Sequence, residues 1–192
     1  RLLFGGQVSI MVGFLTAICA AFIGTTIGLF AGYYGGWLDS FLMRVTDSVI
    51  ALPLLPLLIV LAGLDLKKIG LHSAIIESES ISLYRIIFII ALVGWTTVAR
   101  LVRGAALTIR ERDFVLAAQA QGAGAARIIR VHVLPNLASP IIVATTLSVG
   151  NIILVESILS FLGLGIQPPI ASWGNLLTNA HELIFTAHWL AF

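Results

Sequence analysis

The sequence predicts an all-α protein, a polytopic transmembrane helical bundle. Of its 192 residues, 59% are hydrophobic and only 10% are charged, whereas a soluble domain usually carries about 25% charged residues. Residues 2–38 contain no Asp, Glu, Lys or Arg. Because a bilayer core about 30 Å thick needs roughly 20 apolar residues as a helix, this run alone is long enough to cross a membrane.

Four complete spans are predicted, over about residues 8–33, 41–64, 82–101 and 138–163, within one transmembrane domain covering 1–192. In the first span, Gly24, Gly28 and Gly32 recur every fourth residue. Such a pattern lets a second helix approach closely. Tight helix packing and a flexible, pore-lining helix are both open interpretations of this face.

The second span contains features that interrupt a regular apolar helix. Arg44 and Asp47 stand three residues apart near its beginning and can pair on one helix face. Pro53 and Pro56 each remove a backbone donor and are expected to kink or interrupt the helix. Inside a membrane such breaks persist only when buried in protein or lining a cavity. Kinked packing and a gate or translocation path are therefore both open.

The fourth span carries one ionisable residue, Glu156. Intramembrane carboxylates are uncommon and are functional candidates by default. The position of Glu156 near the far end of the span favours a structural acid held by hydrogen bonds, which a neighbouring subunit could supply. A proton carrier is the alternative.

The arginines predict the orientation of the chain. Six of its eleven Lys and Arg residues lie between residues 100 and 130. Loops with excess Lys and Arg stay in the cytoplasm, so the loop 102–136 is expected inside and the loops 65–80 and 164–186 outside. Residues 172–186 are expected to form a short amphipathic helix at a surface.

The polar segment 111–136 is unlike the apolar chain around it. Asp113 is expected to cap a helix over 114–121, and Gly122 stands where a glycine should end that helix. Gly124 frees the turn, and a second helix over 125–133 is expected to end before Pro135. The first helix would present a ridge of small side chains that suits a groove on another protein: Ala117, Ala118 and Ala120. An amphipathic helix on lipid headgroups is the alternative.

Several motifs resemble one family of membrane proteins. Ala117-Ala118-x-x-x-Gly122, followed by His132-Val-Leu-Pro135, is similar to the EAA motif of bacterial ABC-transporter permeases. Four further stretches resemble the C-type permease subunit of dipeptide, oligopeptide and nickel importers, and the resemblance covers essentially the whole chain. These stretches are Gly32-Tyr-Tyr-Gly-Gly-Trp37, Ala51-Leu-Pro53, Ala99-Arg-Leu-Val-Arg103 and Ser160-Phe-Leu-Gly-Leu-Gly-Ile-Gln-Pro-Pro169.

The resemblance implies a MetI-like permease fold in the bacterial inner (plasma) membrane. It implies a heterodimer with a second permease subunit, two cytoplasmic ATPase subunits and an extracytoplasmic solute-binding protein. Asp113, Leu116, Ala117, Ala118, Gly122, Gly124 and Pro135 would then belong to the element that docks on an ATPase. Family members have about six spans, so the sequence is expected to be a fragment that lacks the first and the last.

Leu116 departs from the family pattern, which has glutamate at this position. If Asp113 caps the helix, residue 116 is the third helical residue, whose glutamate bonds back to the cap residue. Leucine cannot form that bond, and the expected cost is about 0.5 kcal/mol. Apolar contact with a partner groove is the expected alternative role.

The expected function is transport without catalysis by this chain. The sequence contains no Gly-x-x-x-x-Gly-Lys-Ser/Thr phosphate loop, so ATP and Mg²⁺ are expected on partner subunits and no cofactor on this one. Membrane lipid is a further expected partner, and no nucleic acid is expected. A secondary transporter or channel is the alternative, and an intramembrane enzyme a more remote one. The solute, whether peptide, nickel or another small molecule, is not specified by any residue.

Overall fold

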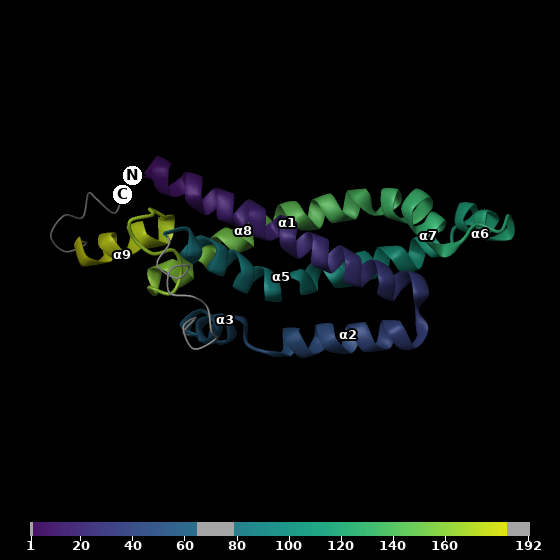
Figure 1. Cartoon of the computed structure of the whole chain (residues 1–192), viewed down its shortest axis with the longest axis horizontal. Helices are drawn as coiled ribbons and strands as arrows, with labels where there is room; N and C mark the ends of the chain where they lie inside the picture. The colour runs from purple at the N-terminus through teal and green to yellow at the C-terminus, as the bar shows by residue number, and fades with distance from the viewer. Residues whose placement is uncertain (1, 65–78, 184–192) are drawn as a thin grey trace. The chain divides into compact units, whose positions relative to one another are not determined.

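The computed structural model describes residues 2–64 and 79–183, and within these ranges every regular element is a helix (Figure 1). The predicted outer loop 65–80 therefore lies almost entirely outside the described residues. The helices are α1 (Leu2–Tyr34), α2 (Gly36–Ala51), α3 (Leu54–Gly63), α5 (Glu79–Arg110), α6 (Asp113–Ala120), α7 (Ala125–Ile128), the π-helix η2 (Ile129–Val133), α8 (Leu134–Phe161) and α9 (Trp173–Leu183).

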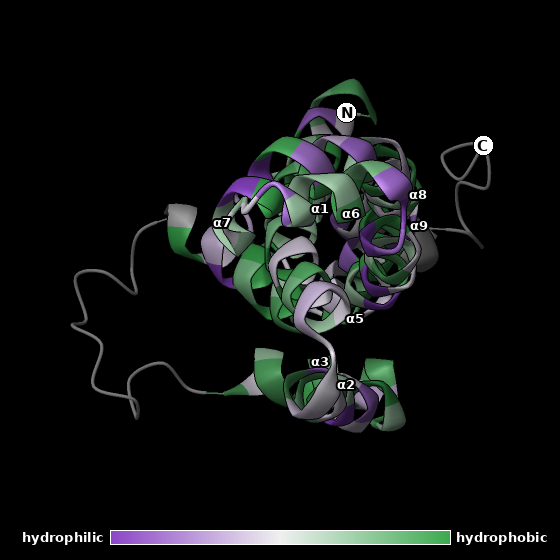
Figure 2. Cartoon of the chain, turned by 90° about the vertical axis from the view of Figure 1, so that its right-hand side faces the viewer, coloured by the Kyte–Doolittle hydropathy of each residue, from purple (hydrophilic) through white to green (hydrophobic). Residues whose placement is uncertain are grey.

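Three helical stretches in the described residues are long and apolar enough to cross a membrane: Leu2–Tyr34, Ile81–Arg110 and Ala125–Phe161. A fourth span is present if the broken pair α2 and α3 is one crossing. Hydrophobic residues occupy much of the helical ribbon (Figure 2), and many are exposed, among them Leu3, Phe22 and Leu147. A surface of this kind is suited to lipid. The prediction of an all-α transmembrane fold is confirmed.

Two of the long helices extend beyond their predicted ends. α5 continues to Arg110 instead of ending near residue 101, and a continuous helix begins at Ala125, ahead of the span predicted from about residue 138. The predicted loop 102–136 is therefore mostly helical, because arginines mark the edge of the apolar stretch without ending the helix. Only residues 111–124, with α6 among them, leave the long helices.

The chain divides into two compact units. Unit 1 contains residues 1–16, 53–92 and 149–192, and unit 2 contains residues 17–52 and 93–148. The helices α1, α5 and α8 supply residues to both units. Unit 2 contains the polar segment and therefore the candidate site.

In unit 1, α9 and the segment before it are tied to the beginning of α1. The backbone N–H of Trp173 donates to the Ser9 hydroxyl (3.1 Å), and its indole N–H donates to the Leu2 carbonyl (3.1 Å). A Cβ on Gly6 would lie 2.9 Å from the Trp173 ring, so this ring packs closely on the α1 backbone. The predicted helix over 172–186 is present as α9, which is described as far as Leu183.

In unit 2, the glycine face of α1 packs on α5. A Cβ on Gly24 would lie 2.5 Å from the Trp95 carbonyl oxygen and 2.8 Å from the Val98 Cβ. A Cβ on Gly32 would lie 2.7 Å from both the Ala106 Cβ and the Arg103 carbonyl oxygen. Because real Cβ atoms do not approach backbone this closely, the face is used for tight helix packing.

Two ion pairs join α2 to α5 in unit 2. Arg103 donates to both carboxylate oxygens of Asp39, at 2.5 and 2.6 Å, and Arg100 donates to Asp47 at 2.6 Å. Asp47 therefore pairs with Arg100, and not with Arg44 as the spacing allows. The reason is that a helix packed alongside brings an arginine to Asp47, a contact that spacing within one helix does not reveal.

Candidate docking site

The helix α6 begins one residue earlier than predicted. Arg112 is extended (φ −76°, ψ 146°) and is the N-cap residue, with no side-chain cap bond. Its carbonyl accepts the first helical bonds, from Val115 (2.9 Å) and Leu116 (3.1 Å). Asp113 is thus the first helical residue and not the cap, so that prediction is wrong. Its carboxylate still lies in the first turn, where the helix dipole favours a negative charge.

This shift changes the meaning of Leu116. With Arg112 as the cap residue, Leu116 is the fourth helical residue, and a glutamate there would not be at the capping-box position. The predicted capping loss at Leu116 therefore does not apply. Leu116 is instead 50% exposed and is free to contact a partner.

The end of α6 is the glycine-terminated motif that the sequence predicts. Gly122 has φ +82°, a backbone conformation that side chains other than glycine rarely adopt. The Ala123 N–H donates to the Ala118 carbonyl (3.0 Å), and the Gly122 N–H donates to the Gln119 carbonyl (2.9 Å). This pair of bonds is a Schellman motif. The predicted role of Gly122 as the helix stop is confirmed.

The two faces of α6 have different roles. Val115 and Ala118 are buried in a core cluster with Val102, Val133 and Leu137. Residues on the opposite face are exposed: Asp113, Leu116, Ala117 and Ala120. The prediction that Ala118 belongs to the presented ridge is therefore wrong, because Ala118 packs against its own chain. Ala117 and Ala120 therefore supply the small side chains of the exposed face, and Ala118 anchors the helix.

Beyond α6 the structure departs from the predicted short helix over 125–133. The turn of α7 passes through the π-helix η2 directly into α8, so the helix does not end before Pro135. The Leu134 N–H bonds to the Ile129 carbonyl, five residues back. A π turn shifts the hydrogen-bond ladder by one residue, which lets a helix accommodate a missing proline donor. Pro135 is exposed on α8, and Gly124 (φ −68°) is the N-cap residue of α7.

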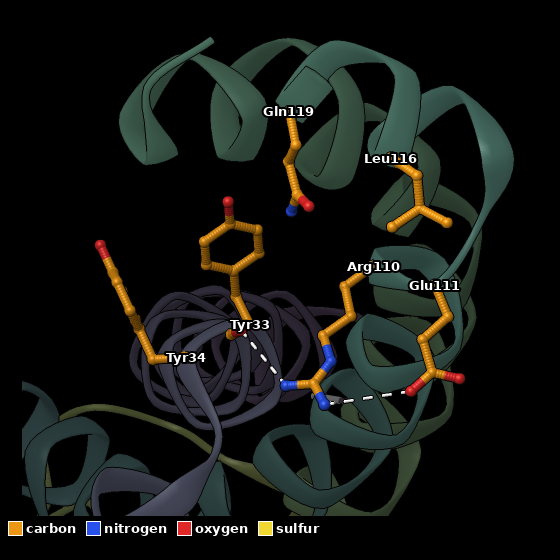
Figure 3. Close-up of a pocket in the computed structure, with 6 residues that line it drawn as sticks. All are labelled: Tyr33, Tyr34, Arg110, Glu111, Leu116 and Gln119. Carbon is orange, nitrogen blue, oxygen red and sulfur yellow. Dashed lines mark hydrogen bonds and ion pairs between the residues drawn. The ribbon is translucent and has the colours of Figure 1, made fainter. Parts of the chain in front are cut away.

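A cavity of about 380 Å³ opens beside α6 (Figure 3). It is lined by the C-terminal ends of two long helices and by one side of α6: Tyr33 and Tyr34 of α1, Arg110 and Glu111 at the end of α5, and Leu116 and Gln119 of α6. The Gln119 side chain points toward the Tyr33 ring, and Arg110 reaches below that ring (Figure 3). The Arg110 guanidinium donates to the carbonyls of Gly32 (3.3 Å) and Tyr33 (3.4 Å) and lies 3.9 Å from Glu111.

Arg110, Glu111 and the two tyrosines were not predicted as site residues. Tyr33 and Tyr34 could be recognised from the sequence only as interfacial aromatics, and Arg110 only as one of several arginines. What joins them is the packing of α1 on α5, which brings Arg110 to the last carbonyls of α1. Among the described residues, no group of three or more His, Cys, Asp or Glu side chains could hold a metal ion.

The two prolines of the predicted second span have different roles. Leu52 and Pro53 are both extended, and this break separates α2 from α3. Pro56 lies in the first turn of α3, where its missing N–H would have no helical partner in any case. Pro53 therefore interrupts the helix as predicted, whereas the prediction that Pro56 also breaks it is wrong.

Glu156, in unit 1, is fully buried. The Ser160 hydroxyl donates to its Oε1 (2.6 Å) and in turn accepts from the Ile166 N–H (3.0 Å). The carboxyl group thereby fixes the segment after α8 to the helix. This arrangement agrees with a hydrogen-bonded structural acid, with the partner coming from the same chain.

Comparison with known proteins places the chain in a family. The family described as binding-protein-dependent transport system inner membrane component matches residues 24–191. Proteins named dipeptide transport system permease protein DppC from Alkalihalophilus pseudofirmus and Bacillus subtilis are each 39% identical, over 98% of this chain and 58% and 55% of their own length. The Haemophilus influenzae protein of that name is 34% identical, over 99% of this chain and 60% of its own.

The chain thus spans somewhat more than half the length of these relatives. The match includes the glycine face of α1, the helix α6 with its glycine stop and the segment after α8. Because the match covers most of this chain, and because the chain has the long apolar helices expected of a membrane component, it belongs to the family of binding-protein-dependent transport system inner membrane components.

Proposed function

We propose that this chain is the central part of a permease subunit in an ATP-driven importer of the bacterial inner membrane, with peptides as the solute class. It would form the translocation path together with a second permease subunit. An extracytoplasmic binding protein would deliver the solute, and two cytoplasmic ATPase subunits would supply the energy. The family description, the names of the relatives and the long apolar helices support this proposal.

The coupling role is supported mainly by the way in which α6 is anchored to the rest of the chain. One face of this helix is anchored by Val115 and Ala118 in the core, and its end is fixed by the Gly122 turn. The opposite face exposes small and apolar side chains, with Leu116 and Ala117 at its centre. A short helix held in this way transmits a push from a partner to α5 and α8, because it has little freedom to move by itself.

The arginine distribution supports a cytoplasmic position for α6 and its flanking residues. ATP hydrolysis would move the ATPase subunits, and α6 would pass that movement to the spans. Such coupling requires that the partner contact α6 differently in the two conformations of the transporter. A secondary transporter or channel would have no need for this anchored helix.

The test replaces Gly122 with valine in the assembled transporter. A β-branched residue is strongly disfavoured at φ +82°, so the turn would rearrange and α6 would lose its position. Uptake of a labelled peptide into proteoliposomes should be abolished while the subunit remains inserted. Gly104→Val is the control, because Gly104 is an exposed glycine within α5 with no neighbour within 4 Å. Normal uptake by the Gly122 variant would refute the coupling role.

A further inference from the structure

The cavity beside α6 is continuous with the proposed docking face. Leu116 belongs to both, since it is exposed on the outer face of α6 and also lines the cavity. A partner that covers the outer face of α6 therefore also covers the mouth of the cavity. The chemistry of the cavity then selects which side chain of that partner enters it.

The positive charge of Arg110 is largely balanced by groups of its own chain. Its guanidinium lies on the carbonyls of Gly32 and Tyr33, the last turn of α1, where the helix dipole contributes roughly half a negative charge. Glu111 lies 3.9 Å away on the other side. Arg110 is held there because Gly35 leaves room, since a Cβ on Gly35 would lie 2.8 Å from the guanidinium.

The remaining groups of the cavity attract a cation. Glu111 is 75% exposed, and its ion pair with Arg110 is long, so its carboxylate retains acceptor capacity. The Gln119 amide oxygen and the Tyr33 hydroxyl are further acceptors with no partner among the described residues, and both face the cavity (Figure 3). The aromatic rings of Tyr33 and Tyr34, 5.3 Å apart and perpendicular, add surfaces that attract cations.

We propose that this cavity receives a basic side chain, lysine or arginine, from the ATPase subunit, and that Glu111 is its counter-ion. The inference rests on the proposed function, in which α6 docks on that subunit. The ammonium or guanidinium group would lie between the Glu111 carboxylate and the tyrosine rings. Its aliphatic part would lie against Leu116, which gives this leucine a role in the contact.

The test measures how strongly the ATPase subunits remain bound to the purified whole transporter, held through a tag on this chain, as the NaCl concentration rises. Glu111→Gln keeps the size of the side chain and removes its charge. Binding of the ATPase subunits should weaken by about fivefold at low salt, as expected for a solvent-accessible ion pair. The difference should shrink as salt screens the pair. Glu111→Asp should retain most of the binding, and Glu111→Lys should weaken it further than glutamine does.

Equal binding by the wild type, Glu111→Gln and Glu111→Lys would overturn the inference. Gly122→Val in the same assay distinguishes an error in the counter-ion role of Glu111 from an error in the docking of α6. If Gly122→Val releases the ATPase subunits and the Glu111 variants do not, only the counter-ion role is wrong. If none of these variants releases them, the docking of α6 is wrong as well.

A lipid amine is the other cation that could reach the cavity. The assay is therefore repeated in nanodiscs with and without phosphatidylethanolamine. We expect the loss of ATPase binding caused by Glu111→Gln to be the same in both. A loss that appears only when phosphatidylethanolamine is present would assign the cavity to the lipid headgroup and overturn the inference.

Discussion

The contact of α1 with α5 and the exposed helix α6 both depend on glycine, for different physical reasons. At Gly24 and Gly32 an added Cβ would meet backbone or side chain at 2.5–2.7 Å. At Gly122 nothing lies within 4 Å, and only the φ of +82° requires glycine. In the first region the choice of residue is limited by the space between the helices. In the second it is limited by the backbone conformation. Substitutions in the packed region should therefore disturb the fold, and those in α6 should disturb coupling.

The largest expected effect is at Gly24. Gly24→Ala places a methyl group against the Trp95 carbonyl and the Val98 side chain, and α5 backbone cannot move aside without separating the helices. Overpacking of this kind costs up to about 3 kcal/mol. The midpoint temperature of thermal unfolding of the purified subunit in detergent should fall strongly. Gly104→Ala is the control, because its Cβ would meet nothing within 4 Å; an equal shift for both variants would contradict the packing account.

The ion pairs between α2 and α5 come next. Asp39 has a side chain only 14% exposed and both its oxygens bound by Arg103, whereas Arg100 and Asp47 are about half exposed. Arg103→Ala leaves a carboxylate without its partner and should cost about 2 kcal/mol, less than a fully buried pair because Arg103 is partly solvated. Arg100→Ala should cost less than about 1 kcal/mol. Thermal stability in detergent checks this order, and the reverse order would refute it.

The smallest effect is expected on the outer face of α6. Leu116→Glu restores the residue of the family pattern at an exposed site that is not a capping position. The free energy of unfolding should change by no more than about 0.5 kcal/mol. A gain of about 1 kcal/mol would instead indicate that residue 116 does act as a capping-box residue, contrary to the position of Arg112.

The sequence predicts features that depend on neighbouring residues. Long apolar runs predict the spans, glycine at every fourth residue of the first span predicts a packing face, and Gly122 predicts the end of α6. Each of these follows from a local pattern of hydrophobicity or backbone conformation.

Features that depend on tertiary contact were not predictable. The bidentate pairing of Asp39 with Arg103 joins residues 64 apart, and the same packing brings Arg110 to the end of α1. The inward orientation of Ala118 depends on its packing in a cluster with Val102, Val133 and Leu137, which come from other helices. The continuation through Pro135 depends on a π turn, which the rule that proline ends helices does not anticipate.

The central proposal is that the outer face of α6 contacts an ATPase subunit. The most direct measurement compares cysteines at two adjacent alanines, in a chain whose only cysteine, Cys19, is first replaced. Ala117 is exposed and Ala118 is buried at 9% exposure. With a short reagent that carries a maleimide at one end and a photoreactive group at the other, Ala117→Cys should cross-link this subunit to the ATPase subunit in the assembled transporter, and Ala118→Cys should not. Absence of a cross-link from Ala117→Cys, with the ATPase subunits still bound, would contradict the central claim.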